Sequence, residues 1–354
     1  MHSGQTSRMP LRLCAALVLL AGCAAGDGGV TPDFVGPPGD ATATDAADAP
    51  PLPLVFTVVS FNAGTTDKLQ HDRDEEAGEG DGYTSAHAAR NATLYSNNLA
   101  WRPAEEALTR WMAETRPEVV LFQELFHDPW CEDITPDPAF DFICDSDQPD
   151  GPRQVERLLG PDYDVACAPG HPDNCVGVLR SFGRIQGCPE DGPCNTSLDG
   201  LPPPSGCTKG ARVATAIIEL PDGRRLHAVD VHTIAGISDE DMACRAEQFT
   251  QVFVDRGDGK PATFGTINLV AGDMNMDPFL WAGLDPSADI WNDHVGEGKP
   301  FHYLSSDDPD GPPTIATLFR IDHVISDVLT GTCVVVGVTD GVPRWRKGSG
   351  QGWL

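Results

Sequence analysis

Residues 269–278 read Leu-Val-Ala-Gly-Asp-Met-Asn-Met-Asp-Pro and join an apolar run to a polar turn. The apolar run, residues 266–271, is typical of a buried strand, and we expect it to end at Gly272. Asp273 and Asn275 follow at alternating positions, so both would leave the strand tip on one side. In an α/β sheet, ligands bind at the carboxyl ends of the strands, where a carboxylate and a carboxamide can hold a cation and donate to a charged oxygen. The alternative is an ordinary turn, because Gly-Asp is a common turn sequence.

The composition limits the classes of protein to consider. The chain has 354 residues with 53 acidic and 24 basic side chains, which gives a net charge of −29. Its length allows one large domain or two medium ones. The strong negative charge disfavours non-specific binding to nucleic acid or anionic lipid, because both repel it on approach. Either can still be a substrate if a divalent cation screens the site.

The N-terminus has the pattern of an export signal. Arg8 and Arg12 precede a short apolar core, and Leu20-Ala21-Gly22-Cys23 follows it. This stretch resembles the lipobox of bacterial lipoproteins. The resemblance implies that residues 1–22 are a lipoprotein signal peptide and that Cys23 carries the lipid. An ordinary secretory signal that ends near a cysteine is the alternative.

The lipoprotein prediction has consequences for location and for the next segment. We expect a bacterial cell-envelope protein that contacts the membrane only through its lipid anchor, at the outer membrane or the cell surface. Residues 23–52 are rich in Gly, Ala, Asp, Thr and Pro and are predicted to form a disordered tether.

The cysteine content agrees with export. Eleven cysteines are present. Removing Cys14 with the signal peptide and Cys23 with the lipid leaves 11 − 2 = 9, an odd number. An exported chain of this kind is expected to form disulfides, although the sequence does not fix their connectivity. The close pairs are Cys131/Cys144, Cys167/Cys175 and Cys188/Cys194.

Strand-like and helical patterns alternate over the remaining chain. The predicted strands are 54–61, 118–122, 163–168, 175–179, 212–220, 225–232, 266–271, 322–325 and 333–338, and the predicted helices are 103–112, 155–159 and 238–254. Asp222-Gly223 between two strand-like runs is a strong hairpin signal. Residues 183–210 are rich in Cys, Pro and Gly and are predicted to be an irregular excursion.

Five strand tips carry polar groups suited to phosphate chemistry. They are Asn62, Glu124, His232, Asp273 with Asn275, and Asp322. Each has an ordinary explanation when taken alone, since a tip carboxylate is usually solvated and a single histidine is usually structural. Together they predict one shared site.

The order of these motifs resembles a known family. Ser60-Phe61-Asn62, Phe122-Gln123-Glu124, Asp230-Val231-His232-Thr233, Gly272-Asp273-Met274-Asn275 and residues 320–325 match the endonuclease/exonuclease/phosphatase superfamily, which has the deoxyribonuclease-I-like fold. The resemblance implies an α/β fold, a four-layer α/β sandwich in which two packed mixed β-sheets are flanked by helices. We assign this domain to residues 53–338.

The resemblance also implies a role for each site residue. Glu124 and Asn62 would hold a hard cation, Mg²⁺ by default, with Ca²⁺ or Mn²⁺ as alternatives. His232 would stabilise the non-bridging oxygens of the phosphate in the transition state. Asp273 would orient the attacking water and Asn275 would steady the phosphate. Asp322 would orient a second catalytic histidine.

That second histidine is missing from its expected place. The family usually carries it on a strand after the Arg-Ile-Asp motif, whereas here residues 339–354 form an atypical basic tail without a strand pattern. His323 follows Asp322 directly, but strand alternation turns it to the opposite face. We hypothesise that a truncation or a frameshift altered the tail. A natural tail, with His294 or His302 supplying the imidazole, is the alternative.

The sequence therefore predicts a metal-dependent phosphoesterase that uses in-line attack of water on a phosphodiester or monoester. Nucleic acid, a phospholipid head group or a small phosphoester all remain open as substrates, because fold does not choose among them. We expect a monomer. The competing hypothesis is a catalytically impaired family member that acts as a surface binding protein.

Overall fold

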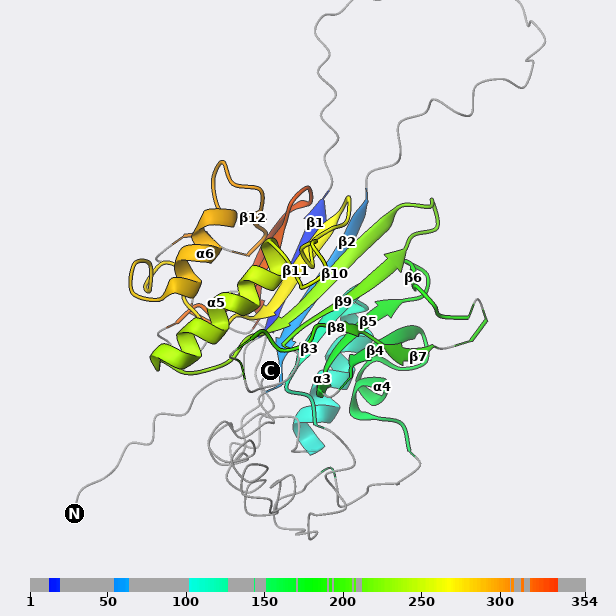
Figure 1. Cartoon of the computed structure of the whole chain (residues 1–354). Helices are drawn as coiled ribbons and strands as arrows, with labels where there is room; N and C mark the ends of the chain where they lie inside the picture. Colours follow the sequence, from blue (N-terminus) through cyan, green and yellow to red (C-terminus); the bar gives the residue numbers. More distant parts are fainter. Residues whose placement is uncertain are drawn as a thin grey trace, which may run out of the picture.

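The computed structural model contains two β-sheets and helices α3–α6 (Figure 1). It describes residues 13–19, 54–63, 102–126, 143, 151–169, 171–189, 191–192, 194–205, 207, 212–305, 307–308, 313–314 and 319–336. The predicted tether, residues 23–52, and the basic tail, residues 339–354, lie outside the described residues, so both stay predictions. None of the helices described has the length and apolar character needed to cross a bilayer.

The first sheet has the strand order β14-β1-β2-β3-β5-β4-β7. These strands are β1 (Leu13–Leu19), β2 (Val55–Asn62), β3 (Val119–Gln123), β4 (Tyr163–Ala168), β5 (His171–Leu179), β7 (Asn195–Ser197) and β14 (Thr330–Val336). The sheet is mixed, because β2 and β3 are parallel whereas β3 and β5 are antiparallel. The parallel register sets Asn62 opposite Gln123, so the two strands end together at one edge.

The second sheet has the strand order β12-β13-β11-β10-β9-β6, and β8 pairs with β9. Its strands are β6 (Arg184–Ile185), β8 (Asp199–Gly200), β9 (Val213–Glu219), β10 (Arg225–His232), β11 (Asn268–Asp273), β12 (His302–Tyr303) and β13 (Asp322–Ser326). β10 and β11 are parallel and the other principal pairs are antiparallel, so this sheet is mixed as well. The hairpin predicted around Asp222-Gly223 is confirmed. The excursion predicted to be irregular contains three short strands, β6, β7 and β8.

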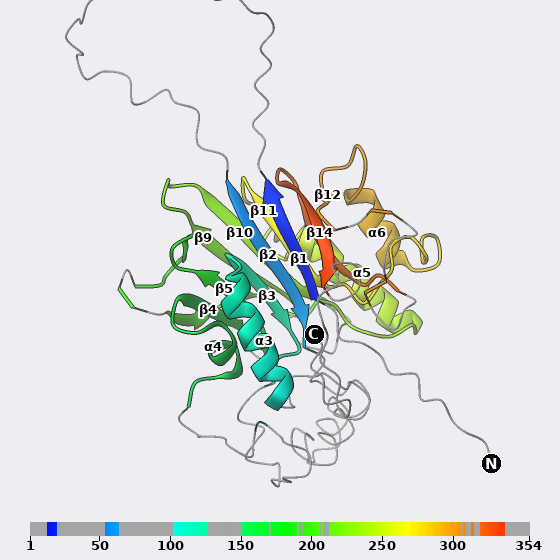
Figure 2. The same cartoon turned by 180° about the vertical axis from the view of Figure 1, so that it is seen from behind.

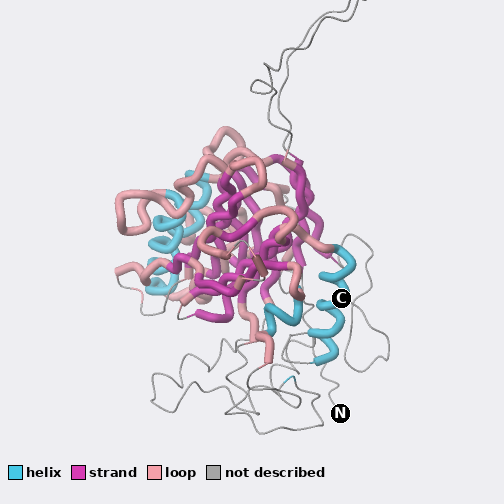
Figure 3. Tube along the Cα trace, turned by 90° about the vertical axis from the view of Figure 1, so that its right-hand side faces the viewer, coloured by secondary structure: helices cyan, strands magenta, loops and turns pink. Residues whose placement is uncertain are grey.

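Three apolar clusters show that the molecule has four layers. One cluster lies between the sheets and includes Val58, Leu121, Ala228 and Leu269. A second packs the first sheet against α3 (Arg102–Thr115) and α4 (Gln154–Leu159). A third packs the second sheet against α5 (Asp239–Phe253) and α6 (Pro286–His294). The predicted α/β sandwich is therefore confirmed, and the helices lie outside the strand layers (Figures 2 and 3).

The crossover helix α5 begins where the sequence indicates. The side chain of Ser238 accepts a hydrogen bond from the backbone N–H of Asp241, which satisfies one of the free donors at the helix start. Three acidic residues in the first turn also favour this end of the helix dipole. The cap therefore sets the start of α5, in the segment that follows His232 at the end of β10.

The N-terminal segment Leu13–Leu19 lies in the first sheet as β1. It pairs antiparallel with both β2 and β14, and it is the strand that joins them (Figure 2). The sequence predicts the same segment to be the apolar core of a signal peptide. The signal peptide and the lipid on Cys23 remain predictions, since strand pairing in the uncut chain does not report on cleavage. Removal of residues 1–22 would leave β2 and β14 without their connecting strand.

Disulfides tie the strands and the excursion together. The pairs Cys167–Cys175 and Cys188–Cys194 are formed as predicted. Cys207–Cys244, which joins the excursion to α5, was not predicted. Cys333 is also disulfide-bonded. Cys131 and Cys144 lie outside the described residues.

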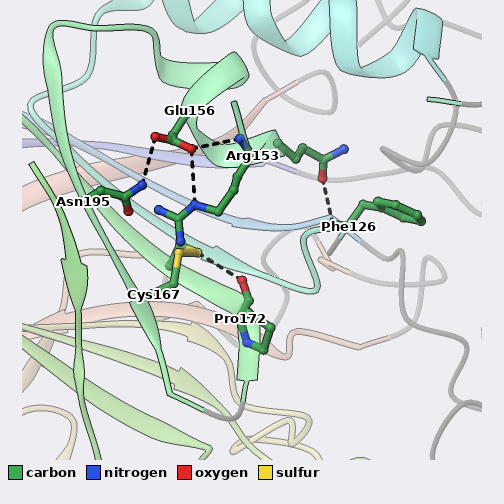
Figure 4. The surroundings of a disulfide bond; sticks show 8 residues. Phe126, Arg153, Glu156, Cys167, Pro172 and Asn195 are labelled. Atoms are coloured by element: carbon green, nitrogen blue, oxygen red, sulfur yellow. Dashed lines mark hydrogen bonds and ion pairs between the residues drawn. A yellow bond between two sulfur atoms is a disulfide. The ribbon is translucent and has the colours of Figure 1, made fainter. Parts of the chain in front are cut away.

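The Cys167–Cys175 bond sits close to the start of α4 (Figure 4). In that helix Glu156 accepts from the backbone N–H of Arg153 and from Asn195, which links α4 to β7. The Gln154 side chain accepts from the backbone N–H of Phe126 at 2.7 Å. Because Phe126 follows Glu124 by two residues, these bonds hold the segment that leaves the tip of β3.

Candidate functional site

Two contacts bridge the sheets at the edge where β2, β3, β10 and β11 end. Asn62 Nδ2 donates to Asp273 Oδ2 at 2.8 Å, which joins β2 to β11. His232 Nε2 lies 3.2 Å from Glu124 Oε1, which joins β10 to the end of β3. Both side chains of the second pair are nearly buried, at 5% and 3% exposed. Four of the predicted site residues therefore meet in two pairs drawn from opposite sheets.

The backbone is strained at two of the predicted residues. Glu124 has φ 54° and Asn275 has φ 44°, both in the left-handed region that side chains rarely adopt. Among the non-glycine residues described, only Arg116 shares this feature. Such strain persists where the surrounding structure fixes it, and it gathers at functional sites.

Gly272 is needed for the close approach of β10 and β11. Its φ is 145°, and a Cβ built on it would lie 1.9 Å from the carbonyl oxygen of Val231. Only glycine fits, so the Gly-Asp sequence of the opening stretch reflects strand packing as well as chemistry. The strand also runs two residues further than predicted, to Asp273. Asp273 is consequently held at the last paired position, opposite His232 on β10 and Asp322 on β13.

Asn275 lies beside Asp273 and is tied to the backbone. Its N–H donates to Asp273 Oδ1 at 2.8 Å, and its Nδ2 donates to the carbonyl of Thr233 at 2.9 Å. These two hydrogen bonds tie the residues that follow β11 to Asp273 and to Thr233 at the end of β10. Asp277, which continues the alternation, accepts from the backbone N–H groups of Phe279, Leu280 and Arg320 and has a structural role.

Asp322 is on the same face as Asp273 and directly across the antiparallel pair β11–β13. Carboxylates directly opposite each other on neighbouring strands repel. Asp322 is half-buried whereas Asp273 is buried. The two carboxylates add negative potential at this edge of the sheet, where a cation would be favoured.

Arg212 is a site residue that the sequence reading missed. Its Nη1 lies 3.5 Å from His232 Nδ1, and its carbonyl accepts the backbone N–H of His232. A guanidinium can only donate, so the contact favours the tautomer with the His232 proton on Nε2, facing Glu124. The hairpin register could have revealed it. Arg225 pairs with Glu219 and Val231 with Val213, which places position 212 opposite position 232.

A second pair that was not predicted from the sequence, Gln123 and Asp230, lies deeper between the two sheets. Gln123 Nε2 donates to Asp230 Oδ1 at 2.6 Å between the sheets, directly below the Glu124–His232 pair. Among the residues that the structure describes, Asp230 Oδ2 has no hydrogen-bond partner. Burial raises the pKa of Asp230 well above its usual value, the Gln123 bond opposes this, and the charge of Asp173 adds to it. The pair fixes the spacing of β3 and β10 where the functional side chains emerge.

The three histidines proposed to replace the missing one are engaged elsewhere. His294 Nδ1 contacts the carbonyl of Ile290, and its ring stacks on Phe253. His302 bonds to the carbonyl of Leu329. His323 Nε2 contacts the carbonyl of Arg320 at 3.0 Å. Each of these three rings is thus held by a backbone carbonyl.

The donor set at the edge fits a hard cation. Glu124, Asn62, Asp273 and Asp322 offer carboxylate and amide oxygens, which Mg²⁺ and Ca²⁺ prefer. In the described residues no three His, Cys, Asp or Glu side chains converge as a dedicated metal cage would. Mg²⁺ is commonly held by one or two protein oxygens, with water and substrate phosphate completing its shell. The arrangement matches that mode.

The chain shows one short sequence match to a known protein and several similarities to solved structures. No family model matches the chain. Ribonuclease PH of Mycolicibacterium smegmatis is 47% identical over 47 residues, which are 12% of this chain and 18% of that protein. The chain thus matches less than a fifth of the length of this relative.

Several solved structures are similar in arrangement. ANGEL2, a 2',3'-cyclic phosphatase, has a TM-score of 0.44 at 11% identity and covers 79% of this chain and 87% of its own. A humanized D. rerio TDP2 has a TM-score of 0.39 at 14% identity, covering 76% and 82%. The human Nocturnin catalytic domain with bound sulfate has a TM-score of 0.38 at 15% identity, covering 66% and 77%. These are likenesses of fold alone.

Proposed function

We propose that the protein is a metal-dependent phosphoric ester hydrolase, in keeping with its resemblance to the endonuclease/exonuclease/phosphatase superfamily. The observation that carries the proposal is the pair of bridges at one edge, His232–Glu124 and Asn62–Asp273. They bring an imidazole, two carboxylates and an amide from four strand tips to one place. This is the set of groups that water attack on a phosphoester requires.

Each side chain has a role set by its contacts. Glu124 and Asn62 would hold a divalent cation, Mg²⁺ in the first instance and Ca²⁺ or Mn²⁺ as alternatives, which would supply Lewis-acid polarisation of the phosphoryl group. Asp273 orients the attacking water, and its position is fixed by Asn62 and by the N–H of Asn275. His232 Nε2–H faces Glu124 in this structure and would turn to the phosphate oxygens on which charge builds once substrate is bound. Asp322 supplies a second carboxylate across from Asp273.

Location and anchoring belong to the same proposal. A lipid on Cys23 and the 23–52 tether would hold the domain at the bacterial envelope, at the outer membrane or the cell surface. The three disulfides among the described residues support an oxidising compartment.

A binding function is the second candidate, and one observation favours it. The rings of His294, His302 and His323, the three candidates for the second catalytic imidazole, all bond to backbone carbonyls. A family member without that imidazole could bind a phosphoester without turning it over.

Turnover of bis-p-nitrophenyl phosphate, plasmid DNA and sphingomyelin with Mg²⁺, Ca²⁺ or Mn²⁺ tests the two candidates. We expect a metal-dependent rate on at least one substrate. Glu124→Ala should lower it by about 10²–10³-fold through loss of a metal ligand and of the partner of His232. Glu106→Ala, at an exposed carboxylate on α3, is the matched control and should keep the full rate. Folded protein with no metal-dependent rate on any substrate would favour the binding candidate.

A further inference from the structure

Three exposed apolar side chains stand on the loops that leave the site. Ile237 is 79% exposed, Leu280 54% and Leu284 75%, and we call them the apolar rim. Ile237 follows His232 by five residues, and Leu280 follows Asn275 by five. Five residues span at most about 18 Å, so neither can lie farther than that from the strand-tip residue it follows. Two of them are the most exposed large apolar side chains among the described residues.

The buried side chain of Arg245 holds the loops that carry the apolar rim. Arg245 is buried, and its guanidinium donates to the carbonyl of Gly236 and to the carboxylate of Asp285. Gly236 precedes Ile237 and Asp285 follows Leu284, so one cation fixes the backbone on both sides. The same guanidinium lies 5.8 Å from the ring centre of Trp281. Isolated exposed apolar residues are ordinary, but three on fixed loops beside a site form a surface that a partner can use.

The charge of the surface around the apolar rim discriminates among the three possible substrate classes, which are nucleic acid, a phospholipid head group and a small phosphoester. Residues 233–244 and 277–293 contain no lysine or arginine. Asp239 and Glu240 are exposed next to Ile237, and Asp289 is exposed near Leu284. This surface repels nucleic acid and anionic lipid, both of which need basic side chains. A small soluble phosphoester does not require an apolar surface of this extent outside the catalytic residues.

We infer that the rim docks on a zwitterionic lipid surface and that the substrate is the phosphoester of a phospholipid head group. The inference rests on the proposed function, which supplies the hydrolytic centre. Ile237, Leu280 and Leu284 enter the acyl boundary while the phosphate reaches Glu124, Asn62 and His232. The acidic flanks face the cationic ends of choline or ethanolamine head groups. The predicted lipid anchor would keep the domain at such a surface.

Tryptophan quenching by brominated phosphatidylcholine tests the docking step without requiring activity. The full chain with Cys23→Ser lacks the lipid, and residues 1–22 contain no tryptophan that could contribute. The chain has seven tryptophans, and Trp281 is the one on the loop between Leu280 and Leu284, so we expect quenching that is clearly reduced in Trp281→Phe. Replacing all three rim residues by serine should weaken vesicle binding by at least about 10-fold, because buried apolar area drives it. Val55→Ser/Val328→Ser, at exposed apolar positions of the opposite edge, is the matched control and should bind like the parent.

Hydrolysis tests the substrate class. The rim variant should lose about 10-fold in rate on sphingomyelin vesicles and keep its rate on bis-p-nitrophenyl phosphate, because the rim is outside the catalytic set. Equal quenching in the rim and control variants would overturn the docking surface. Loss of a dimer in the rim variant on size exclusion would identify a contact between copies instead. Rim-dependent quenching without hydrolysis of any substrate would retain the docking surface and reject the proposed function.

Discussion

Two buried histidines in the second sheet behave in opposite ways. His232 ends β10 on the face between the sheets, where it meets Glu124 from the other sheet. His323 lies on β13 and faces α6, where its ring packs against Trp291 and Tyr303. Burial lowers the pKa of His323 to about 4, and the carbonyl of Arg320 only partly opposes this. Both side chains are imidazoles, and the face of the strand on which each lies decides its environment. His232 meets the carboxylate of Glu124, whereas His323 meets the rings of Trp291 and Tyr303.

The activities of matched His232 and His323 variants test the difference between the two histidines most directly. His232→Asn should lower kcat/KM on bis-p-nitrophenyl phosphate by about 10²–10³-fold, because it removes the donor to the phosphate oxygens. His323→Asn should stay within about threefold, since its ring contacts no site residue. Circular dichroism of both variants controls for folding. Similar losses of activity in the two folded variants would contradict the distinction.

The stability of the protein in acid sharpens the comparison. His323 has a folded pKa of about 4 against an ordinary 6.5, so the folded state binds fewer protons than the unfolded state between these values. Its contribution is present above pH 6.5 and is lost as the pH falls towards 4. Urea titrations from pH 7 to 4 should show a loss on the order of 2 kcal/mol from this residue, and His323→Asn should lack that component. Parallel pH profiles for the two proteins would show that the ring does not titrate as its burial implies.

The smallest expected effect concerns the layer beneath His232. The folded pKa of Asp230 is raised, so its carboxyl group stabilises the fold below the ordinary pKa of 3.8 and this contribution is lost as the pH rises through the folded value. Asp230→Asn keeps the shape without the charge. It should raise the unfolding free energy at neutral pH by about 1 kcal/mol, with the gain vanishing in acid. A destabilised Asp230→Asn at neutral pH would indicate that the ionised carboxylate is required.

Much of the fold could be predicted because its signals are local. Alternating apolar residues marked β2, β9 and β10, and Ser238 marked the start of α5. The pairs Cys167–Cys175 and Cys188–Cys194 close short loops, so nearness in the chain was enough to suggest them. Cys207–Cys244 spans 37 residues and depends on how α5 packs. The role of Leu13–Leu19 as β1 also escaped prediction, because an apolar run fits a signal peptide and a central strand equally well.

The sequence by itself determined which chemical groups end the strands and in what order. Asn62, Glu124, His232, Asp273 and Asp322 follow from strand patterns, and alternation already turned His323 away from Asp322. Only the tertiary structure decided the partners, because Glu124 meets His232 and Asn62 meets Asp273 across two sheets whose packing no local pattern specifies. The buried Gln123–Asp230 pair and the loops fixed by Arg245 arise in the same way. Contacts over more than 100 residues of chain at the site depend on how the layers stack, and stacking is settled by the whole core.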